Sequence, residues 1–434
     1  MSWVADELTN ASATWKTFTA IVKVRQGSTG ENMKTAQGVL MLSSGAAVAL
    51  MLGAAMPAAA SPAGRHNANS TGSITSILKT GDIVTGVRGT ADGKVVLTGS
   101  APAGGGTQTG PFLYEGTLTA AAKGAAVSVL TPPFPGVTSA TFYGPDTHSF
   151  NPKAIPSGEV RAVGSYVSSS APAGVHDQGM IYLGPVTGSG GSWKSIDVPA
   201  DGAHTVGHVR ACPKSRSHCF VMDTIAHSTM GDLVVGNYDL NPTVGGGLAS
   251  GNAFIYNMAR QQWTLLRLGG SLSSKTTLYG IWQNGGDASP RYTLAGGSSA
   301  RWTRHGVLRR TQRGFLMAYN ERTGAFGKPR YYRYGNAPAL VTHFDGITAV
   351  PGGFDLVTIS SAQDASMAFV PVKAHGRSFG TATWYPIPVT KSPLCSGGCS
   401  QATGNTVYKN LVMGIYLQSG SPVVNTYLAI ISRR

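Results

Sequence analysis

Short runs of aromatic and β-branched residues, separated by Gly-rich turns, recur along most of the chain. The stretch 252–286 shows the pattern most clearly. Its sequence, NAFIYNMARQQWTLLRLGGSLSSKTTLYGIWQNGG, reads as strand, turn, strand, double-glycine turn, strand and a final glycine turn. Such runs suit pleated, half-buried surfaces, and glycine allows the chain to reverse between them. The pattern predicts an all-β protein.

One strand-like segment recurs six times. The copies are KVVLTGS (94–100), VRAVGSY (160–166), DLVVGNY (232–238), RYTLAGG (291–297), FDLVTIS (354–360) and NLVMGIY (410–416). Five copies carry a glycine near the end, namely Gly99, Gly164, Gly236, Gly296 and Gly414. The fifth copy has Thr358 instead, and successive positions are 65, 72, 60, 62 and 56 residues apart.

Each copy has further strand-like segments around it. A second segment follows it, as in NAFIYNMA (252–259), a third ends in a turn, and a fourth precedes it, as in TTLYGIWQNGG (276–286). Four short strands in a unit of about 60 residues, repeated six times, predict a β-propeller of six four-stranded blades. We expect 73–81, SITSILKTG, to complete the sixth blade and close the ring. A β-sandwich or a solenoid is the alternative.

The segment 33–60 has the pattern of a secretory signal. It combines Lys34, an apolar stretch at 39–52 and a small-residue end at 58–60. The apolar stretch is short for a membrane span, which needs about 20 residues. We therefore predict an upstream extension at 1–32, a signal peptide at 33–60 and a single propeller domain at 61–434, secreted or periplasmic. An uncleaved anchor or a buried segment is the alternative.

The four cysteines form two close pairs in the sequence, Cys212 with Cys219 and Cys395 with Cys399. Local pairs in an exported chain suit loop-closing disulfides. Metal binding is the alternative for the first pair because four histidines surround it, but their spacing matches no zinc signature. These histidines are His204, His208, His218 and His227.

The stretch 252–297 resembles the repeat of bacterial extracellular HAF-repeat proteins. In that family an HAF strand precedes an LGTLGG-like turn, an A-x-G-I-N strand and a V-V-G strand. Here 252–254 reads NAF, 268–270 reads LGG and 279–281 reads YGI. The resemblance covers about one-seventh of the chain. It implies an extracellular location and a repeat architecture, and it transfers no active site.

Two common catalytic motifs are absent from the sequence: there is no H-E-x-x-H and no G-x-x-x-x-G-K-[ST] pattern. No cofactor is expected. Glycoside hydrolysis needs two opposed carboxyl groups, and several aspartates are candidates for a shared face. Each is more simply explained as a turn residue that bonds its own backbone. These candidates are Asp146, Asp177, Asp232, Asp239, Asp287 and Asp345.

Charge is the most distinctive chemical feature. The net charge is +15, and ten basic residues lie within 291–333 against the single acid Glu321. Much of this run falls between two expected strands of the fourth blade, so we expect a loop there. Arginine pairs with sulfates, phosphates and carboxylates and stacks on aromatic faces. The candidate ligand-binding residues are Arg301, Trp302, Arg304, Arg309, Arg310, Arg313, Arg330, Tyr332 and Arg333.

Three functional classes remain open from the sequence. The first is a secreted, monomeric binding protein that recognises an anionic envelope or matrix polysaccharide through the basic loop; nucleic acid ranks lower because the protein is exported. The second is a hydrolase or lyase with its site over the central channel. The third is a structural or adhesive surface protein. A solvated basic surface without a specific ligand is the plain alternative to the first class.

Overall fold

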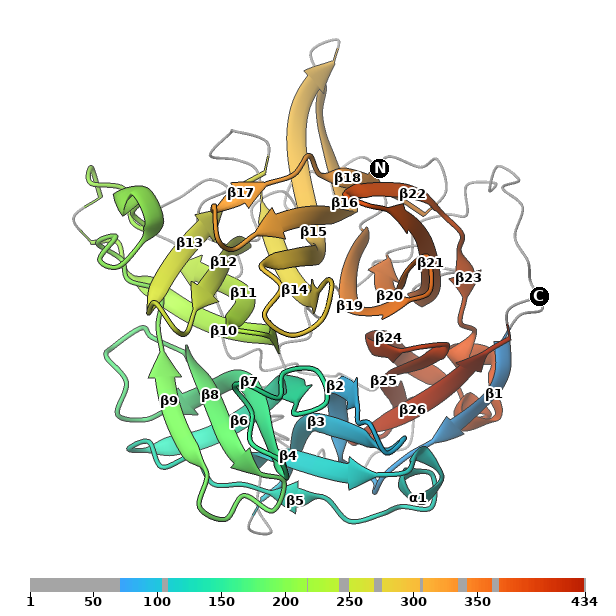
Figure 1. Cartoon of the computed structure of the whole chain (residues 1–434). Coiled ribbons are helices and arrows are strands. Elements are labelled where there is room, and N and C mark those ends of the chain that lie inside the picture. Colours follow the sequence, from blue (N-terminus) through green and yellow to red (C-terminus); the bar gives the residue numbers. More distant parts are fainter. Residues whose placement is uncertain are drawn as a thin grey trace, which may run out of the picture.

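The fold is built almost entirely from β-strands arranged as six small antiparallel sheets in a ring (Figure 1). A computed structural model describes residues 71–103, 108–216, 218–241, 250–268, 275–304, 307–334, 342–360 and 367–432. The predicted upstream extension at 1–32 and signal peptide at 33–60 lie outside these residues. Within them, no helix is long and apolar enough to cross a membrane.

Each sheet is one blade of a six-bladed β-propeller, as the repeat predicts. The innermost strands are β2 (Ile83–Gly89), β6 (Val137–Thr147), β10 (Val221–Met230), β14 (Thr276–Gln283), β19 (Thr342–Val350) and β24 (Cys399–Tyr408). The second strands, which hold the recurring segment, are β3 (Val95–Pro102), β7 (Glu159–Ser168), β11 (Leu233–Leu240), β15 (Arg291–Arg304), β20 (Gly353–Ser360) and β25 (Leu411–Gln418).

The third and outer strands complete the blades. The third strands are β4 (Thr109–Gly116), β8 (Asp177–Pro185), β12 (Asn252–Asn257), β16 (Val307–Asn320), β21 (Met367–His375) and β26 (Val424–Ile431). The outer strands of the first five blades are β5 (Ser128–Val129), β9 (Ser192–Ile196), β13 (Gln262–Leu266), β17 (Ala325–Phe326) with β18 (Arg330–Tyr332), and β22 (Ser378–Ala382) with β23 (Tyr385–Pro386). One short helix, α1 (Leu118–Ala121), lies between β4 and β5.

The ring closes through β1 (Thr71–Ser76), which is the outer strand of the sixth blade. It pairs antiparallel with β26, with Ile74 opposite Ala429 and Ser76 opposite Tyr427. The backbone N–H of Val84 in the first blade donates to the Thr426 hydroxyl at 2.9 Å and ties the two blades together. The predicted N-terminal closure is confirmed, with the strand slightly upstream of the expected 73–81.

The glycine of the recurring segment has a steric role. In five blades it lies in the second strand opposite the inner strand, where a Cβ would come within 1.8–2.1 Å of a carbonyl oxygen of that strand. Directly beside each of these positions the pairing register shifts by one residue, which is a β-bulge. Glycine is therefore required because the bulged inner strand presses against the second strand.

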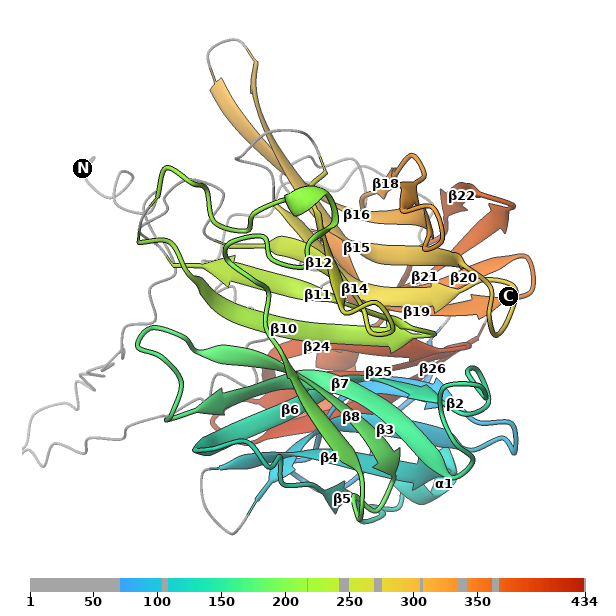
Figure 2. The ribbon, with the colours of Figure 1, turned by 60° about the vertical axis from the view of Figure 1, so that its left-hand side comes forward.

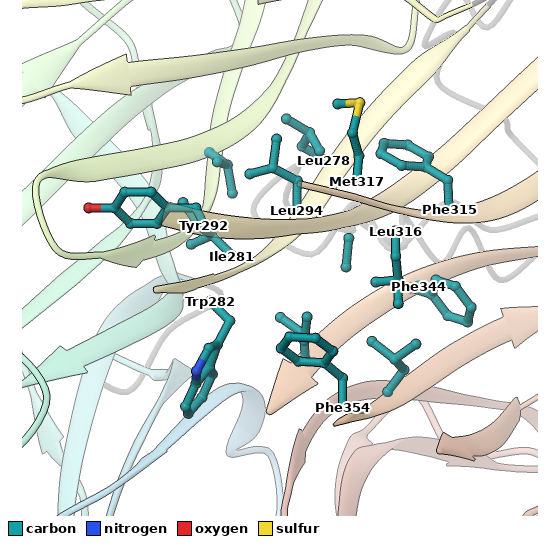
Figure 3. Packing of buried hydrophobic residues seen from close by; sticks show 14 of the residues in the cluster. Leu278, Ile281, Trp282, Tyr292, Leu294, Phe315, Leu316, Met317, Phe344 and Phe354 are labelled. Carbon is teal, nitrogen blue, oxygen red and sulfur yellow. The ribbon is translucent and has the colours of Figure 1, made fainter. Parts of the chain in front are cut away.

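Apolar side chains fill the space between neighbouring blades. The largest cluster runs from the third blade to the fifth and buries residues such as Leu294, Phe315, Phe344 and Phe354 (Figure 3). Five such clusters cover the ring, and each combines strands of adjacent blades. Burial of this apolar area is the main stabilising contribution to the fold.

The basic run of the fourth blade is not a loop, contrary to the expectation from its composition. Strands β15 and β16 both continue through it as one antiparallel ladder, with Arg301 opposite Arg310 and Trp302 opposite Arg309. The resulting hairpin, which we call the basic hairpin, projects beyond the ring in both views (Figures 1 and 2). The expectation of a loop was wrong because arginine-rich polar composition is more usual in loops, whereas here the backbone ladder between β15 and β16 continues through the run.

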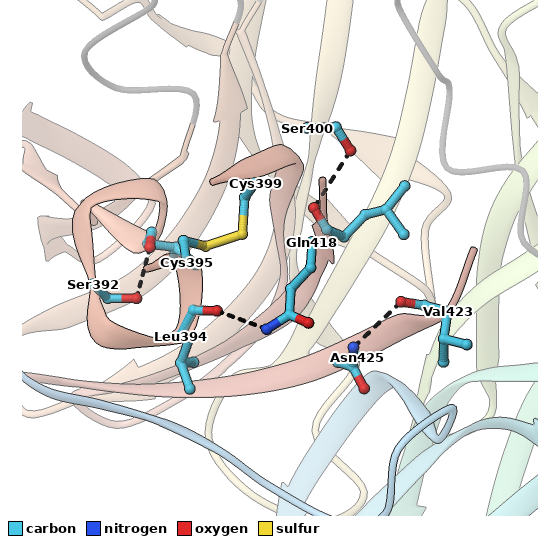
Figure 4. The surroundings of a disulfide bond; sticks show 10 residues. Ser392, Leu394, Cys395, Cys399, Ser400, Gln418, Val423 and Asn425 are labelled. Atoms are coloured by element: carbon cyan, nitrogen blue, oxygen red, sulfur yellow. Dashed lines mark hydrogen bonds between the residues drawn. A yellow bond between two sulfur atoms is a disulfide. The ribbon is translucent and has the colours of Figure 1, made fainter. Parts of the chain in front are cut away.

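Both predicted disulfides form. Cys212 and Cys219 close a short loop before β10, and Cys395 and Cys399 close a turn at the start of β24. In the second case Gln418 donates its side-chain amide to the carbonyl of Leu394 at 3.1 Å, so the turn is fastened to β25 (Figure 4).

Candidate active site in the central channel

The six inner strands surround the axis of the propeller and run in the same direction along it. We call the end where they begin the upper end and the end where they finish the lower end. All six inner strands share a bulge at an equivalent height, and the bulged residue is half-buried; β6, β10 and β24 have a second register shift near their start. These six residues, the bulge ring, are Thr85, Tyr143, His227, Tyr279, Asp345 and Asn405.

Members of the bulge ring reach the next blade. Asn405 donates to the carbonyl of Val84 at 3.0 Å, and the hydroxyl of Thr85 donates to the carbonyl of Phe142. In four blades a glycine follows the bulged residue, and a Cβ on Gly144, for example, would lie 2.7 Å from the carbonyl oxygen of His227. Small residues after the bulge therefore let neighbouring inner strands approach closely.

Four aromatic or imidazole rings form a continuous row along blades two to five. Tyr143 and His227 have ring centroids 4.9 Å apart, His227 and Tyr279 4.6 Å, and Tyr279 and His343 5.0 Å. Burial lowers the pKa of His227 to about 3, with a further contribution from His343, so His227 is a neutral ring at physiological pH. We call these four residues the channel row.

An ion pair ends the channel row in the fifth blade. His343 Nε2 lies 3.1 Å from Asp345 Oδ1. Burial opposes the charged form of His343, but the neighbouring Asp345 raises the His343 pKa above its usual value. Burial also raises the pKa of Asp345, against the effect of His343. The second carboxyl oxygen of Asp345 is buried and has no hydrogen-bond partner among the described residues.

Three aspartates gather at the upper end between the second and third blades. We call them the upper aspartate cluster. Asp177 begins β8, Asp223 lies near the start of β10, and Asp239 lies near the end of β11. The Asp177 backbone N–H donates to Asp223 Oδ1 at 3.1 Å, and the Ser165 hydroxyl donates to Asp177 Oδ1 at 3.0 Å. Gly251 N–H donates to Asp239 at 2.7 Å.

The pKa values of this cluster are spread. Burial, with a contribution from Asp223, raises the pKa of Asp177 to about 8. Burial raises the pKa of Asp223 to about 6, and burial raises that of Asp239 to about 6. At neutral pH the cluster therefore holds one protonated carboxyl group beside two largely ionised ones. Such a separation is typical of acid–base sites.

The upper aspartate cluster and the channel row belong to one site. The Tyr143 hydroxyl is hydrogen-bonded to Ser165, the partner of Asp177, and burial together with Asp177 raises the Tyr143 pKa. Burial together with Asp345 raises the pKa of Tyr279, and Asp239 adds to this effect. The two tyrosines thus lie between carboxyl groups and remain protonated hydrogen-bond donors.

The described residues close the channel at its lower end. Arg88 of the first blade donates to the carbonyls of Pro145 at 3.2 Å and Thr229 at 3.5 Å, in the second and third blades. Its guanidinium also lies 5.0 Å from the Trp282 ring of the fourth blade, on the opposite side of the ring, and 5.9 Å from Phe150. Arg88 therefore crosses the axis at the lower end and contacts three other blades.

The candidate aspartates from the sequence are divided between several places. Asp177 and Asp239 join the upper aspartate cluster, and Asp345 belongs to the bulge ring. Asp146 is fully buried near the lower end, where Arg88 and Arg161 influence its pKa, so it is a structural residue. Asp232 and Asp287 lie in turns outside the site.

The third member of the cluster was missed by the sequence reasoning. Asp223 is in VMDTIAHSTM, an inner strand with a less regular apolar pattern than its counterparts in blades one, four and five. Counting back from the recurring segment would have found it. No group of three His, Cys, Asp or Glu side chains in the described ranges is placed to hold a metal ion.

The predicted ligand-binding residues lie on or beside the basic hairpin. Arg301, Trp302 and Arg304 are in β15, and Arg309, Arg310 and Arg313 are in β16. Arg330 and Tyr332 are in β18, and Arg333 follows it. Tyr332 is only 6% exposed, donates to the carbonyl of Gly380 at 3.0 Å and packs against Phe344, so its side chain belongs to the core rather than to a ligand surface.

No protein-family model matches the chain, and no curated protein matches it. Solved structures do resemble it. A mutant α-L-arabinofuranosidase Arb93A from Fusarium graminearum, in complex with an iminosugar inhibitor, has a TM-score of 0.50 at 10% identity. The match covers 83% of this chain and 98% of that chain. An α-L-arabinanase from Penicillium chrysogenum has a TM-score of 0.43 at 8% identity, covering 83% and 98%. An ulvan lyase has a TM-score of 0.40 at 9% identity, covering 84% and 82%. The similarity to the arabinofuranosidase agrees with the propeller fold.

Proposed function

We propose that this protein is a carbohydrate-active enzyme that hydrolyses a glycosidic bond at the upper end of its central channel. The observation that carries the proposal is the upper aspartate cluster, in which three carboxyl groups from three strands meet beside the channel row. The similar fold of an α-L-arabinofuranosidase supports a glycosidic bond as the target. The main function is thus assigned to the channel and not to the basic surface.

The pKa values suit the division of labour that glycoside hydrolysis requires. One carboxylic acid must protonate the leaving oxygen, and a second carboxylate must act as base or nucleophile. Asp177, with a pKa of about 8, is protonated at neutral pH and takes the role of general acid. Asp223 and Asp239, with pKa values of about 6, supply the ionised carboxylate.

The channel row would hold the sugar. Tyrosine and neutral histidine faces give a broad surface on which the apolar face of a sugar ring can stack, while their polar atoms and the Asp345 carboxyl group offer hydrogen bonds. Because Arg88 and Trp282 close the lower end, the sugar would enter and the product would leave by the upper end.

The substrate polymer is proposed to be extracellular and anionic. The two disulfides favour an oxidising compartment, and the basic hairpin starts from the fourth blade with Arg301, Arg304, Arg309 and Arg310 along its strands. Binding of a polymer by these arginines would be an accessory to cleavage, or the main function if the channel proves inactive.

The test is release of reducing ends from arabinan and from neutral and anionic polysaccharides by the protein comprising residues 61–434. Ultraviolet absorbance of an unsaturated uronate would identify a lyase instead. We expect Asp177→Asn to lower kcat by about 10²–10⁴-fold, the usual contribution of a general acid. The matched control is Asp201→Asn, since Asp201 is exposed and only bonds the backbone N–H of Ala203.

The pH profile gives a second readout. The rate should fall above pH of about 8 as Asp177 ionises and below about 6 as Asp223 and Asp239 are protonated. No product from any of these polysaccharides, or full activity in Asp177→Asn, would contradict the proposal.

A further inference from the structure

The base of the basic hairpin carries Arg313 in β16 and Arg333 directly after β18. In the fourth blade β18 pairs with β16 through Leu316 opposite Arg330, Phe315 opposite Tyr331 and Gly314 opposite Tyr332. Arg313 and Arg333 are the next residues beyond the last of these pairs. Residues directly opposite each other on antiparallel strands have Cβ atoms about 5 Å apart. Continued by one residue past the end of β18, this register places Arg333 beside Arg313.

Arg313 is held in place by an aromatic ring rather than by an acid. Its guanidinium carbon lies 4.0 Å from the centroid of the Tyr331 ring, which is close stacking. The Arg313 Nε atom is buried and has no hydrogen-bond partner among the described residues. Arg333 is exposed.

No carboxylate in the described part of the chain forms an ion pair with these two arginines. None of the ion pairs between described residues includes an arginine. Glu321 is the only acid between Asp287 and Asp345 in the sequence, and its carboxylate already accepts from Asn257 at 2.8 Å and from Tyr292 at 3.3 Å. Like charges on opposite positions of a sheet are destabilising, so the pair gains from an external anion.

We propose that Arg313, Tyr331 and Arg333 form a binding site for the sulfate or carboxylate group of an anionic sugar residue. The guanidinium fork matches both oxyanions, and stacking on Tyr331 fixes the plane of the Arg313 fork. We call this the hairpin-base site. The inference rests on the proposed function, because it assigns the substrate to acidic polysaccharides whose charged groups are held on the rim while the channel acts on the glycosidic bond.

The protein of residues 61–434 is bound to immobilised dextran sulfate, polygalacturonate or neutral dextran, and the salt concentration that elutes it is measured. The dissociation constant for each soluble polymer is measured separately. The double variant Arg313→Gln/Arg333→Gln is expected to bind the anionic polymers about tenfold more weakly, the loss of about one charge-assisted hydrogen bond. The matched control is Arg322→Gln/Lys328→Gln, which removes two exposed positive charges of the same blade away from the site.

The control variant should bind as the wild type does. Equal weakening of both double variants would mean general charge attraction and would overturn the site, as would no weakening of the first or equal retention on neutral dextran. Retention on dextran sulfate alone or on polygalacturonate alone identifies the group as sulfate or carboxylate. Arg313→Lys/Arg333→Lys keeps the charge and lacks the fork, so it should still bind less tightly than the wild type; wild-type affinity would overturn the assignment.

Failure of this inference can be separated from failure of the proposed hydrolase. Asp177→Asn should bind the anionic polymers normally while losing cleavage, because Asp177 is in the channel and not at the hairpin base. Normal binding with no cleavage by the wild type would reject the hydrolase and retain the site. Cleavage of neutral polymers with no retention on anionic ones would reject the site and retain the hydrolase.

Discussion

The close packing between an inner and a second strand gives the sharpest test of the fold, and Gly296 is one of the five glycines at which it occurs. In the fourth blade a Cβ on Gly296 would lie 1.9 Å from the carbonyl oxygen of Thr277 and 3.1 Å from Leu278 Cα. Real Cβ atoms essentially never come within 3.0 Å of such neighbours. Gly296→Ala therefore requires β14 and β15 to separate by about 1 Å, at a place where both strands are buried.

The expected loss of stability in Gly296→Ala depends on which atoms must move to admit the Cβ. Overpacking of a well-packed core usually costs about 1–3 kcal/mol, and here the obstacle is backbone rather than a flexible side chain. Separation also strains the bulge at Tyr279, the edge-to-face contact of its ring with His227 and its stacking on His343. We expect a loss of about 3 kcal/mol in the free energy of unfolding, which corresponds to a decrease in Tm of roughly 5 °C or more.

Urea and thermal unfolding followed by circular dichroism measure this loss. The control is Gly397→Ala, since a Cβ there meets no atom within 4 Å and the backbone does not require a positive φ. Alanine at position 397 should leave stability unchanged or raise it slightly by reducing the entropy of the unfolded chain. Equal stability of Gly296→Ala and wild type would refute the view that the recurring glycine exists to admit the bulged strand.

Three further predictions concern buried charge, pH and the second disulfide. Asp146→Asn alters a fully buried carboxyl group that accepts backbone N–H bonds from Thr147 and Gly231, and it should cost about 1–3 kcal/mol in urea unfolding, whereas Asp92→Asn on the surface should leave the midpoint unchanged. The pKa of Asp177 is about 8 when folded and about 4 when unfolded, so the folded protein binds the extra proton between these values. Stability should therefore decrease as pH rises from about 4 to about 8, and Asp177→Asn should flatten this slope in a series of unfolding curves; an unchanged slope would contradict the assignment. Replacing Cys395 and Cys399 by serine should cost about 2 kcal/mol, the chain-entropy value for so short a loop, and unaltered unfolding in the reduced wild type would argue against it.

Most of the fold could be predicted from the sequence because the repeated segment reflects a local steric requirement. A second strand that must lie against a bulged inner strand needs glycine at one position, and apolar residues on either side of it follow from burial between blades. Closure by an N-terminal strand was also predictable, because the strand-like segment 73–81 precedes the first inner strand and has no partner in that blade. The resemblance to HAF-repeat proteins stays a prediction, since no family model matches the chain.

The site was less predictable, because its residues come from strands that are far apart in the sequence. Asp177, Asp223 and Asp239 have nothing in common in their local sequence, and only the neighbouring positions of β8, β10 and β11 bring them together. The bulge ring was hidden for a similar reason. A bulge shifts the register by one residue, so strict alternation along the inner strand no longer says which side chains face the axis.

In the fifth blade a threonine replaces the recurring glycine, and this difference affects the inner strand that contributes to the candidate site. At the fifth position Thr358 lies opposite Phe344, where the other blades have glycine, and its hydroxyl donates to the carbonyl of His343 at 2.6 Å. In the other five blades a Cβ would collide with the equivalent carbonyl, so the inner strand of the fifth blade must follow a different path there. That strand is the one that contributes the His343–Asp345 ion pair to the channel. The replacement of glycine by Thr358 is tolerated because a hydrogen bond to the His343 carbonyl takes the place of close backbone packing. This hydrogen bond positions the backbone of His343 near the axis.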